Sequence, residues 1–173
     1  MKPLPAAGLF TWIICFPTGP AALAAELLQG RCHMNYCNWF SIESRDIVAS
    51  GKSGALAKAE IKEWGSFHPD GDYKRHRPRT GGQLSASYFF CSKTKPAAIW
   101  EDAGKWQGAV LNVASPSGAE ENITIQYFAV CHGVTSGNDA DDAYDVLARR
   151  FGYSPIEGAD LPVLVRPEDI LRD

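Results

Sequence analysis

Apolar and polar residues alternate along much of the chain, which is the pattern of β-strands that bury one face. In the segment 84–91, for example, Leu84 and Ala86 alternate with Ser85 and Ser87. The same pattern, bounded by turn residues, predicts strands at 38–50, 55–64, 84–91, 97–101, 106–113 and 122–131. The connections between the last four segments are short, so we expect neighbouring strands to pair antiparallel.

The segment 55–64 carries two conflicting signals. Its alanine, leucine, lysine and glutamate residues favour a helix by intrinsic propensity. Ala57, Ala59 and Ile61, however, alternate strictly with charged residues, and a glycine lies on either side of the segment. We therefore expect a strand here.

One helix is predicted, over residues 139–151. Asp139 or the asparagine before it caps the helix, further aspartates load its positive end, and two arginines precede the stop at Gly152. An apolar stripe that includes Val146 and Leu147 is expected to lie against the sheet.

The remaining tail, 154–173, is punctuated by three prolines. It holds a short apolar piece at 161–165 and a predicted final turn of helix that begins at Pro167. Together these patterns predict a mainly β fold, an antiparallel sandwich or partly open barrel with one C-terminal helix packed on it.

The first 24 residues have the composition of an export signal. Lys2 precedes an apolar run at 8–16, and an Ala-Leu-Ala tripeptide at 22–24 has the small-x-small pattern of a signal peptidase site. A membrane anchor is the alternative, but two prolines break the run below the ~20 residues that span a bilayer. We expect a signal peptide cleaved before Ala25, and a secreted or periplasmic protein without a transmembrane segment.

Four cysteines remain beyond the leader, namely Cys32, Cys37, Cys91 and Cys131. An even number in an exported chain predicts two disulfides, with buried free thiols as the alternative. In one extended strand Cys32 and Cys37 would lie about 17 Å apart on opposite faces, out of bonding range. They therefore either close a tight loop together or pair separately with the other two. Alternation along 122–131 places Cys131 on the core face.

The length, apolar content and net charge of the chain bear on its domain count and on its partners. The chain has 173 residues, of which 45% are hydrophobic, and a formal net charge of −3. That length and apolar content suit one globular domain over 25–173. Export and a negative net charge argue against nucleic acid as a partner.

The most heavily charged segment runs from His68 to Arg79, HPDGDYKRHRPR, and its acids and histidines form one candidate site. The residues with metal-ligating side chains are His68, Asp70, Asp72 and His76, which suit a zinc or non-haem iron centre of a small secreted hydrolase. The spacing matches no zinc motif, however, and four cations in the same segment repel a metal ion. Pro-Asp-Gly-Asp is also a turn signature by itself. We therefore predict neither a metal nor another cofactor.

Four permanent cations and a histidine of the same segment form the second candidate site, and they are Lys74, Arg75, Arg77, Arg79 and His76. Arginine side chains match the geometry of carboxylate, phosphate or sulfate groups. The alternatives are a solvated surface loop and an internal match to the acidic residues at 139–145.

Other residues offer weaker candidates. His33 and His132 each follow a cysteine, and bridging those two cysteines would bring the imidazoles together, although hydrogen-bonded scaffolding is the commoner role. The chain has no Gly-x-Ser-x-Gly elbow. The adjacent acids Glu101-Asp102 and Glu120-Glu121 are typical of solvated turns.

Four tryptophans and a glycosylation sequon are further candidates for a site. The tryptophans Trp39, Trp64, Trp100 and Trp106 could stack on sugars, but their place in or beside predicted strands favours packing. Asn122-Ile123-Thr124 is a glycosylation sequon, which is meaningful only after passage through an endoplasmic reticulum.

The sequence thus predicts an exported, non-enzymatic binding protein of inhibitor or adaptor type. It would contact an anionic partner, a protein or a smaller ligand, through the cationic segment 74–79. Two alternatives stay open: the metal-dependent hydrolase described above, and a structural protein of the cell envelope.

Overall fold

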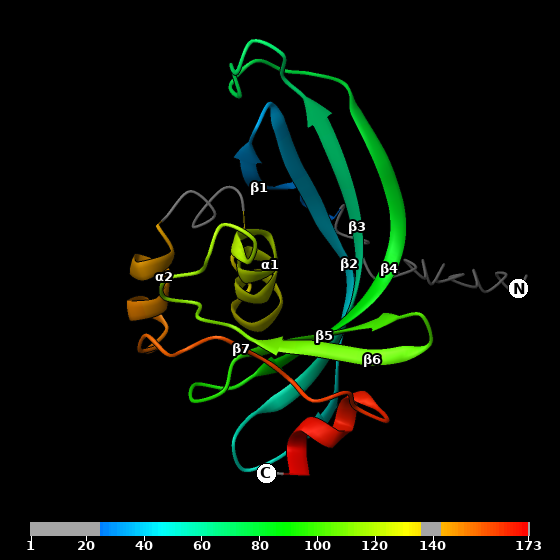
Figure 1. Ribbon diagram of the computed structural model, residues 1–173, viewed down its shortest axis with the longest axis vertical. Coiled ribbons are helices and arrows are strands. Elements are labelled where there is room, and N and C mark those ends of the chain that lie inside the picture. Colours follow the sequence, from blue (N-terminus) through cyan, green and yellow to red (C-terminus); the bar gives the residue numbers. More distant parts are fainter. Residues whose placement is uncertain (1–24, 136–142, 173) are drawn as a thin grey trace, which may run out of the picture.

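The computed structural model describes residues 25–135 and 143–172 and shows one antiparallel sheet (Figure 1). Its strands are β1 (Leu28–His33), β2 (Tyr36–Ser50), β3 (Ala55–Phe67), β4 (Arg79–Cys91), β5 (Ala97–Asp102), β6 (Lys105–Val110) and β7 (Ala159–Asp160). Within the described residues these seven strands follow chain order across an open sheet. The mainly β, antiparallel prediction is therefore confirmed. The predicted signal peptide, 1–24, and the N-terminal turn of the predicted helix, 139–142, lie outside the described residues.

The strands predicted at 38–50, 55–64, 84–91 and 97–101 are confirmed as β2, β3, β4 and β5. In β3, strand alternation outweighs helix propensity because Ala57, Ala59 and Ile61 are all buried in the core. The strand predicted at 106–113 ends at Val110 as β6.

The strand predicted at 122–131 is wrong, because this segment forms helix α1 (Glu121–His132). Seven consecutive residues of α1, Thr124 to Val130, are buried, so the helix is enclosed on every side. An all-round apolar helix has no polar face, and periodicity cannot separate it from a buried strand. Two missed signals mark its ends. Glu120 accepts a hydrogen bond from the Ser117 amide at 2.9 Å, as in half of a capping box, and Gly133 closes the helix at φ 68°.

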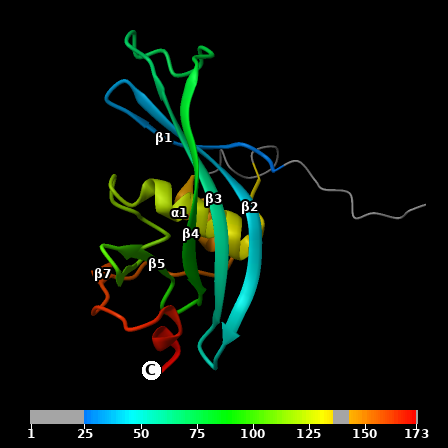
Figure 2. The same ribbon diagram turned by 90° about the vertical axis from the view of Figure 1, so that its right-hand side faces the viewer.

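The core lies between the concave face of the sheet and α1 (Figures 1 and 2). Side chains from β2 to β5 and α1, such as Phe40, Phe89 and Phe128, form the main apolar cluster. Helix α2 (Tyr144–Arg150), the described part of the predicted 139–151 helix, adds Leu147 to this cluster. The helix that lies against the sheet is thus α1, with α2 beside it.

The C-terminal tail covers part of the opposite face of the sheet. A second apolar cluster joins Leu56 and Ile99 of the sheet to Ile170 of a 3₁₀ helix, η1 (Pro167–Arg172). The predicted final helical turn at Pro167 is therefore confirmed. Apolar clusters therefore pack on both faces of the sheet, one against α1 and α2 and the other against η1.

Two disulfides are present, Cys32–Cys37 and Cys91–Cys131. The first spans the β1–β2 hairpin, whose two-residue turn, Met34 and Asn35, has positive φ at both positions. The tight-loop alternative is therefore the correct one. The second ties the end of β4 to the last turn of α1.

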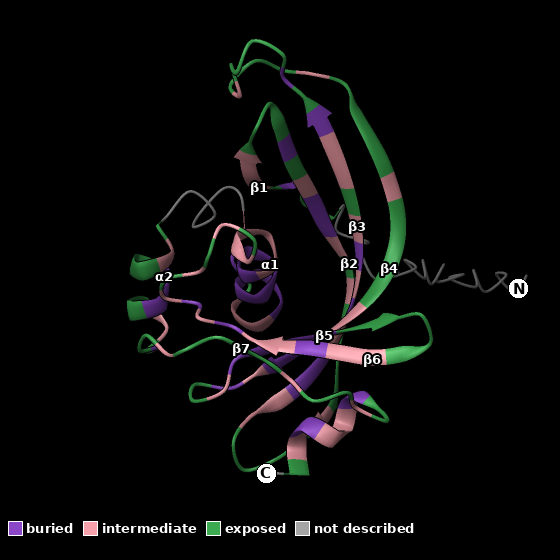
Figure 3. Cartoon of the chain, in the orientation of Figure 1, coloured by how far each residue is buried: buried purple, intermediate pink, exposed green. Residues whose placement is uncertain are grey.

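The upper halves of β2, β3 and β4 extend beyond the core. Residues 79–86 of β4 are almost all exposed (Figure 3). This extension ends in the β3–β4 loop, residues 68–78, which carries the charged segment identified in the sequence.

Candidate functional site: a cationic groove

The β3–β4 loop and the neighbouring strands line a groove of about 600 Å³, which we call the basic groove. Its lining residues are Gln29, Cys32, Trp39, Tyr73, Lys74, Arg75, His76, Arg77 and Arg79. All five binding residues predicted from the sequence, four cations and His76, therefore line one concavity. No acidic residue occurs among these lining residues.

A chain of hydrogen bonds fixes the base of the loop to the sheet. The indole N–H of Trp39 donates to Ser66 Oγ at 2.8 Å, and Ser66 Oγ lies 2.9 Å from His68 Nε2. His68 Nδ1 donates to the carbonyl oxygen of Asp72 at 2.9 Å. Because His68 and Ser66 are almost fully buried, these bonds form away from competing water.

The predicted turn at Pro69-Asp70-Gly71-Asp72 is confirmed. The Gly71 amide donates to the carbonyl oxygen of His68 at 3.0 Å, and Gly71 has φ 67°, which glycine adopts without strain. The loop is also tied to the β1–β2 hairpin, because the Asn35 amide donates to the Tyr73 hydroxyl at 3.2 Å. The loop is thus bonded both to β3, through Ser66 and His68, and to the β1–β2 hairpin.

Asp70 neutralises part of the loop's charge. Its Oδ2 lies 2.6 Å from Arg77 Nη2 and 3.6 Å from Arg75 Nη1. Partial desolvation opposes ionisation, but hydrogen bonds from Arg77 and from backbone amides prevail and lower the pKa of Asp70. Lys74 and Arg79 form no ion pair with any acidic side chain in the described part of the chain. The excess positive charge of the groove therefore comes mainly from Lys74, Arg75 and Arg79.

Arg79 is positioned by an aromatic ring. Its guanidinium carbon lies 4.1 Å from the centroid of the Trp39 ring, within the range of a cation–π contact. This contact restrains a long side chain without consuming its hydrogen-bond donors. The N–H groups of Arg79 are therefore left for an anion in the groove.

The metal-ligand alternative is not supported by the positions of its residues. His68 is buried and uses both ring nitrogens in the chain described above, whereas Asp70 is engaged by arginines and His76 is exposed. No group of three or more histidine, cysteine, aspartate or glutamate side chains in the described residues is placed to hold a metal ion. The four residues of that alternative are not brought together.

Ser66 and His68 have the spacing of a nucleophile and its base, which the sequence alone did not reveal. Ser66 is 3% exposed and His68 is 1% exposed, and neither lines the basic groove. A substrate in the groove would not reach them. Their contact therefore serves to position the loop.

The idea that His33 and His132 converge is wrong, because Cys32 and Cys131 belong to different disulfides. His132 has a scaffolding role instead, with its Nε2 2.8 Å from the Tyr153 hydroxyl. The acidic residues near 145 do not neutralise the groove in the described part of the chain, because Asp145 pairs with Arg149 at 2.6 Å. Residues 139–142 of that acidic segment lie outside the described residues.

Two other sequence candidates make structural contacts. Glu121 forms an ion pair with Arg31, and Trp106 packs edge-on against Tyr88. In the sequon, Asn122 lies in the first turn of α1 and Thr124 is fully buried, so the folded protein does not present it for glycosylation.

Sequence reasoning missed Trp39 and Tyr73 as members of the site. Tyr73 lies within the charged segment, so its place there was the available signal. Trp39 is distant in sequence, and only the strand pairing that places it near Ser66 brings it to the groove.

Comparison with protein-family models, curated proteins and solved structures found no match for this chain. No helix in the described residues is long and apolar enough to cross a membrane.

Proposed function

We propose that this protein is an exported, non-enzymatic binding protein of inhibitor or adaptor type that contacts an anionic partner through the basic groove. One observation carries the proposal: Lys74, Arg75, Arg77 and Arg79 line a single concavity that has no acidic lining residue. Convergent arginine and lysine side chains favour carboxylate, sulfate or phosphate groups. A groove of about 600 Å³ is in the usual range for a specific binding site.

The disulfides support a location outside the cytosol. Cys32–Cys37 and Cys91–Cys131 suggest an oxidising extracellular or periplasmic environment. A signal peptide over 1–24, cleaved before Ala25, would deliver the chain there.

The surface beside the groove favours an acidic protein as the partner. Met34, Tyr36 and Phe67 are 78%, 56% and 50% exposed at the same end of the molecule, and the Tyr36 and Phe67 rings are 5.0 Å apart. The Asn35–Tyr73 hydrogen bond holds this apolar tip next to the cationic loop. Exposed aromatic residues beside arginines are typical of protein interfaces.

The test compares two variants with the same change in net charge. K74Q/R75Q/R79Q removes groove cations but keeps Arg77, whose bond to Asp70 holds the loop. R45Q/K52Q/K105Q removes three exposed cations elsewhere. Binding to poly-L-glutamate is measured by titration calorimetry at low and high salt, and circular dichroism confirms folding.

We expect the groove variant to bind at least tenfold more weakly, and to show a shallower salt dependence, than the wild type. The control variant should stay within about twofold to threefold of the wild type, because screened distant charges contribute little. Equal losses in both variants would show that only net charge matters and would contradict a groove-specific site.

A further inference from the structure

A second cavity, of about 160 Å³, lies between the sheet and the first two turns of α1. Its lining includes Asn38 and Phe40 of β2, Glu63 and Gly65 of β3, and Asn122 and Gln126 of α1. Trp39 and Trp64 complete the lining. Trp39 is the one lining residue that this cavity shares with the basic groove, and the other lining residues of the two sites are different.

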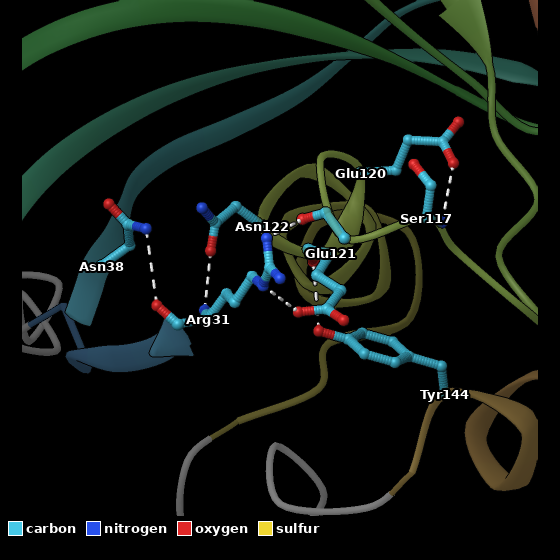
Figure 4. Close-up of polar contacts among 8 residues, drawn as sticks. Arg31, Asn38, Ser117, Glu120, Glu121, Asn122 and Tyr144 are labelled. Atoms are coloured by element: carbon cyan, nitrogen blue, oxygen red, sulfur yellow. Dashed lines mark hydrogen bonds and ion pairs between the residues drawn. The ribbon is translucent and has the colours of Figure 1, made fainter. Parts of the chain in front are cut away.

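The orientation of each amide in this cavity follows from its partner, and Figure 4 shows Asn38 and Asn122 with Arg31. Asn38 Nδ2 donates to the Arg31 carbonyl oxygen at 3.4 Å, and Asn122 Oδ1 accepts from the Arg31 amide at 2.7 Å. Gln126 Nε2 donates to Glu63 Oε1 at 2.6 Å. A carbonyl and a carboxylate can only accept and a backbone amide can only donate, so no amide can be reversed.

The groups left over are mostly acceptors. Asn38 Oδ1, Gln126 Oε1 and Glu63 Oε2 have no hydrogen-bond partner among the described residues. Gln126 is only 4% exposed. Its Oε1 has no partner but is not fully enclosed, since among the described residues only Arg77 Nε and Thr124 Oγ1 are both enclosed and unpartnered. That oxygen therefore keeps accessible surface, and the cavity that Gln126 lines provides it.

The charge at the cavity is negative. Glu63 is the one ionisable side chain in its lining within the described residues. The guanidinium of Arg31, whose backbone bonds Asn38 and Asn122, is engaged by Glu121 at 2.8 Å (Figure 4) and by the Gly118 carbonyl oxygen at 2.7 Å. A carboxylate with two further oxygen acceptors suits a ligand that carries positive charge and several N–H donors.

We propose that this cavity binds a primary ammonium group on a short aliphatic chain. At ~30 Å³ per water-sized group, 160 Å³ holds about five such groups, which matches an ammonium and four methylenes. Phe40, which is 2% exposed, supplies apolar surface for the methylenes. A free diamine and a lysine side chain of a partner share this chemistry.

Two variants test the cavity, with one matched control. E63Q removes the charge and keeps an oxygen that accepts from Gln126. G65V takes up about half of the cavity at ~30 Å³ per added carbon and leaves too little room for the ligand. A Cβ on Gly65 would meet nothing within 4 Å, and valine suits a strand. E60Q removes a carboxylate from the opposite face of β3 and serves as the control.

Calorimetry of the mature protein uses putrescine, Nα-acetyl-lysine N-methylamide, and 1,4-butanediol as an uncharged analogue. We expect at least one amine to bind, at least tenfold weaker binding to E63Q, no measurable binding to G65V, and a change within twofold for E60Q. Binding of putrescine alone identifies a free diamine, and binding of the lysine derivative alone identifies a partner's lysine. Absence of amine binding to the wild type, unchanged binding to G65V, or equal binding of butanediol would overturn the proposal.

Discussion

The imidazole of His132 stacks on the ring of Phe151, with centroids 4.2 Å apart and planes inclined by 12°. The same imidazole meets the Tyr153 hydroxyl, so it is held by an aromatic face and a hydrogen bond. Burial, reinforced by the positive charges of Lys93 and Arg45, lowers the pKa of His132 to about 4. This site links the end of α1 to the segment that follows α2.

The lowered pKa predicts a specific loss of stability in mild acid. An unfolded histidine has a pKa of about 6.5, so as pH falls from there toward 4 the unfolded chain gains a proton that the folded chain refuses. The His132 contribution to the free energy of unfolding is complete above pH 6.5 and declines through this window. We expect a decline on the order of 1–2 kcal/mol, because the half-exposed ring is partly screened by solvent.

Urea unfolding at pH 7.5 and pH 4.5 measures this loss in the wild type and in H132Q, which cannot take up the proton. Other titrating groups contribute equally to both proteins. The wild type should lose more stability than the variant between the two pH values. The same loss in both proteins would show that His132 does not carry it.

Tyr153 is the centre of a buried hydroxyl network. Its hydroxyl lies 2.8 Å from the Tyr127 hydroxyl and 2.8 Å from His132 Nε2. The Tyr127 hydroxyl also donates to the Ser92 carbonyl oxygen at 3.2 Å. Y153F removes one hydroxyl and leaves the fully buried Tyr127 and the partly buried His132 each short of a bond, so we expect a loss of about 1–2 kcal/mol. Thermal or urea unfolding measures it. Y88F is the control, since the Tyr88 hydroxyl has no hydrogen-bond partner among the described residues, and a similar loss there would contradict the network's role.

The two disulfides should contribute unequally to stability. Cys91 and Cys131 are 40 residues apart, whereas Cys32 and Cys37 are five apart. Chain-entropy estimates give about 4 kcal/mol for the longer loop and about 2 kcal/mol for the shorter. Replacing each pair by alanines and measuring urea unfolding should reproduce this order. A larger loss from removing Cys32–Cys37 would mean that hairpin geometry outweighs loop entropy.

Mutation of His68 should destabilise the protein far more than mutation of His76. H68A deletes a 1% exposed side chain that bonds Ser66 and Asp72, so we expect a loss of about 2–3 kcal/mol. H76A alters an exposed side chain and should stay within ~0.5 kcal/mol. Unfolding curves with and without added zinc measure both. Zinc stabilisation of the wild type that either variant abolishes would revive the metal site.

The sequence predicted most of the sheet because each strand carries its own signal. Alternation at period two is a property of neighbouring residues, and it identified β2 to β5 to within a few residues. The disulfide count and the turn at Pro69-Asp70-Gly71 were equally local. The four cations and the histidine of the groove were found for the same reason, since all five residues lie within 74–79.

What the sequence could not reveal depends on burial and on contacts between distant segments. Helix α1 was predicted as a strand because it is buried on all sides and so has no polar face. This burial results from the packing of α2 and the sheet around the helix. The cysteine pairing required the hairpin turn at Met34 and Asn35. Trp39 behind Arg79, and Glu63 beside Gln126, are brought together by strand register and helix docking. Such contacts leave no local pattern in the chain, so only the tertiary structure determines them.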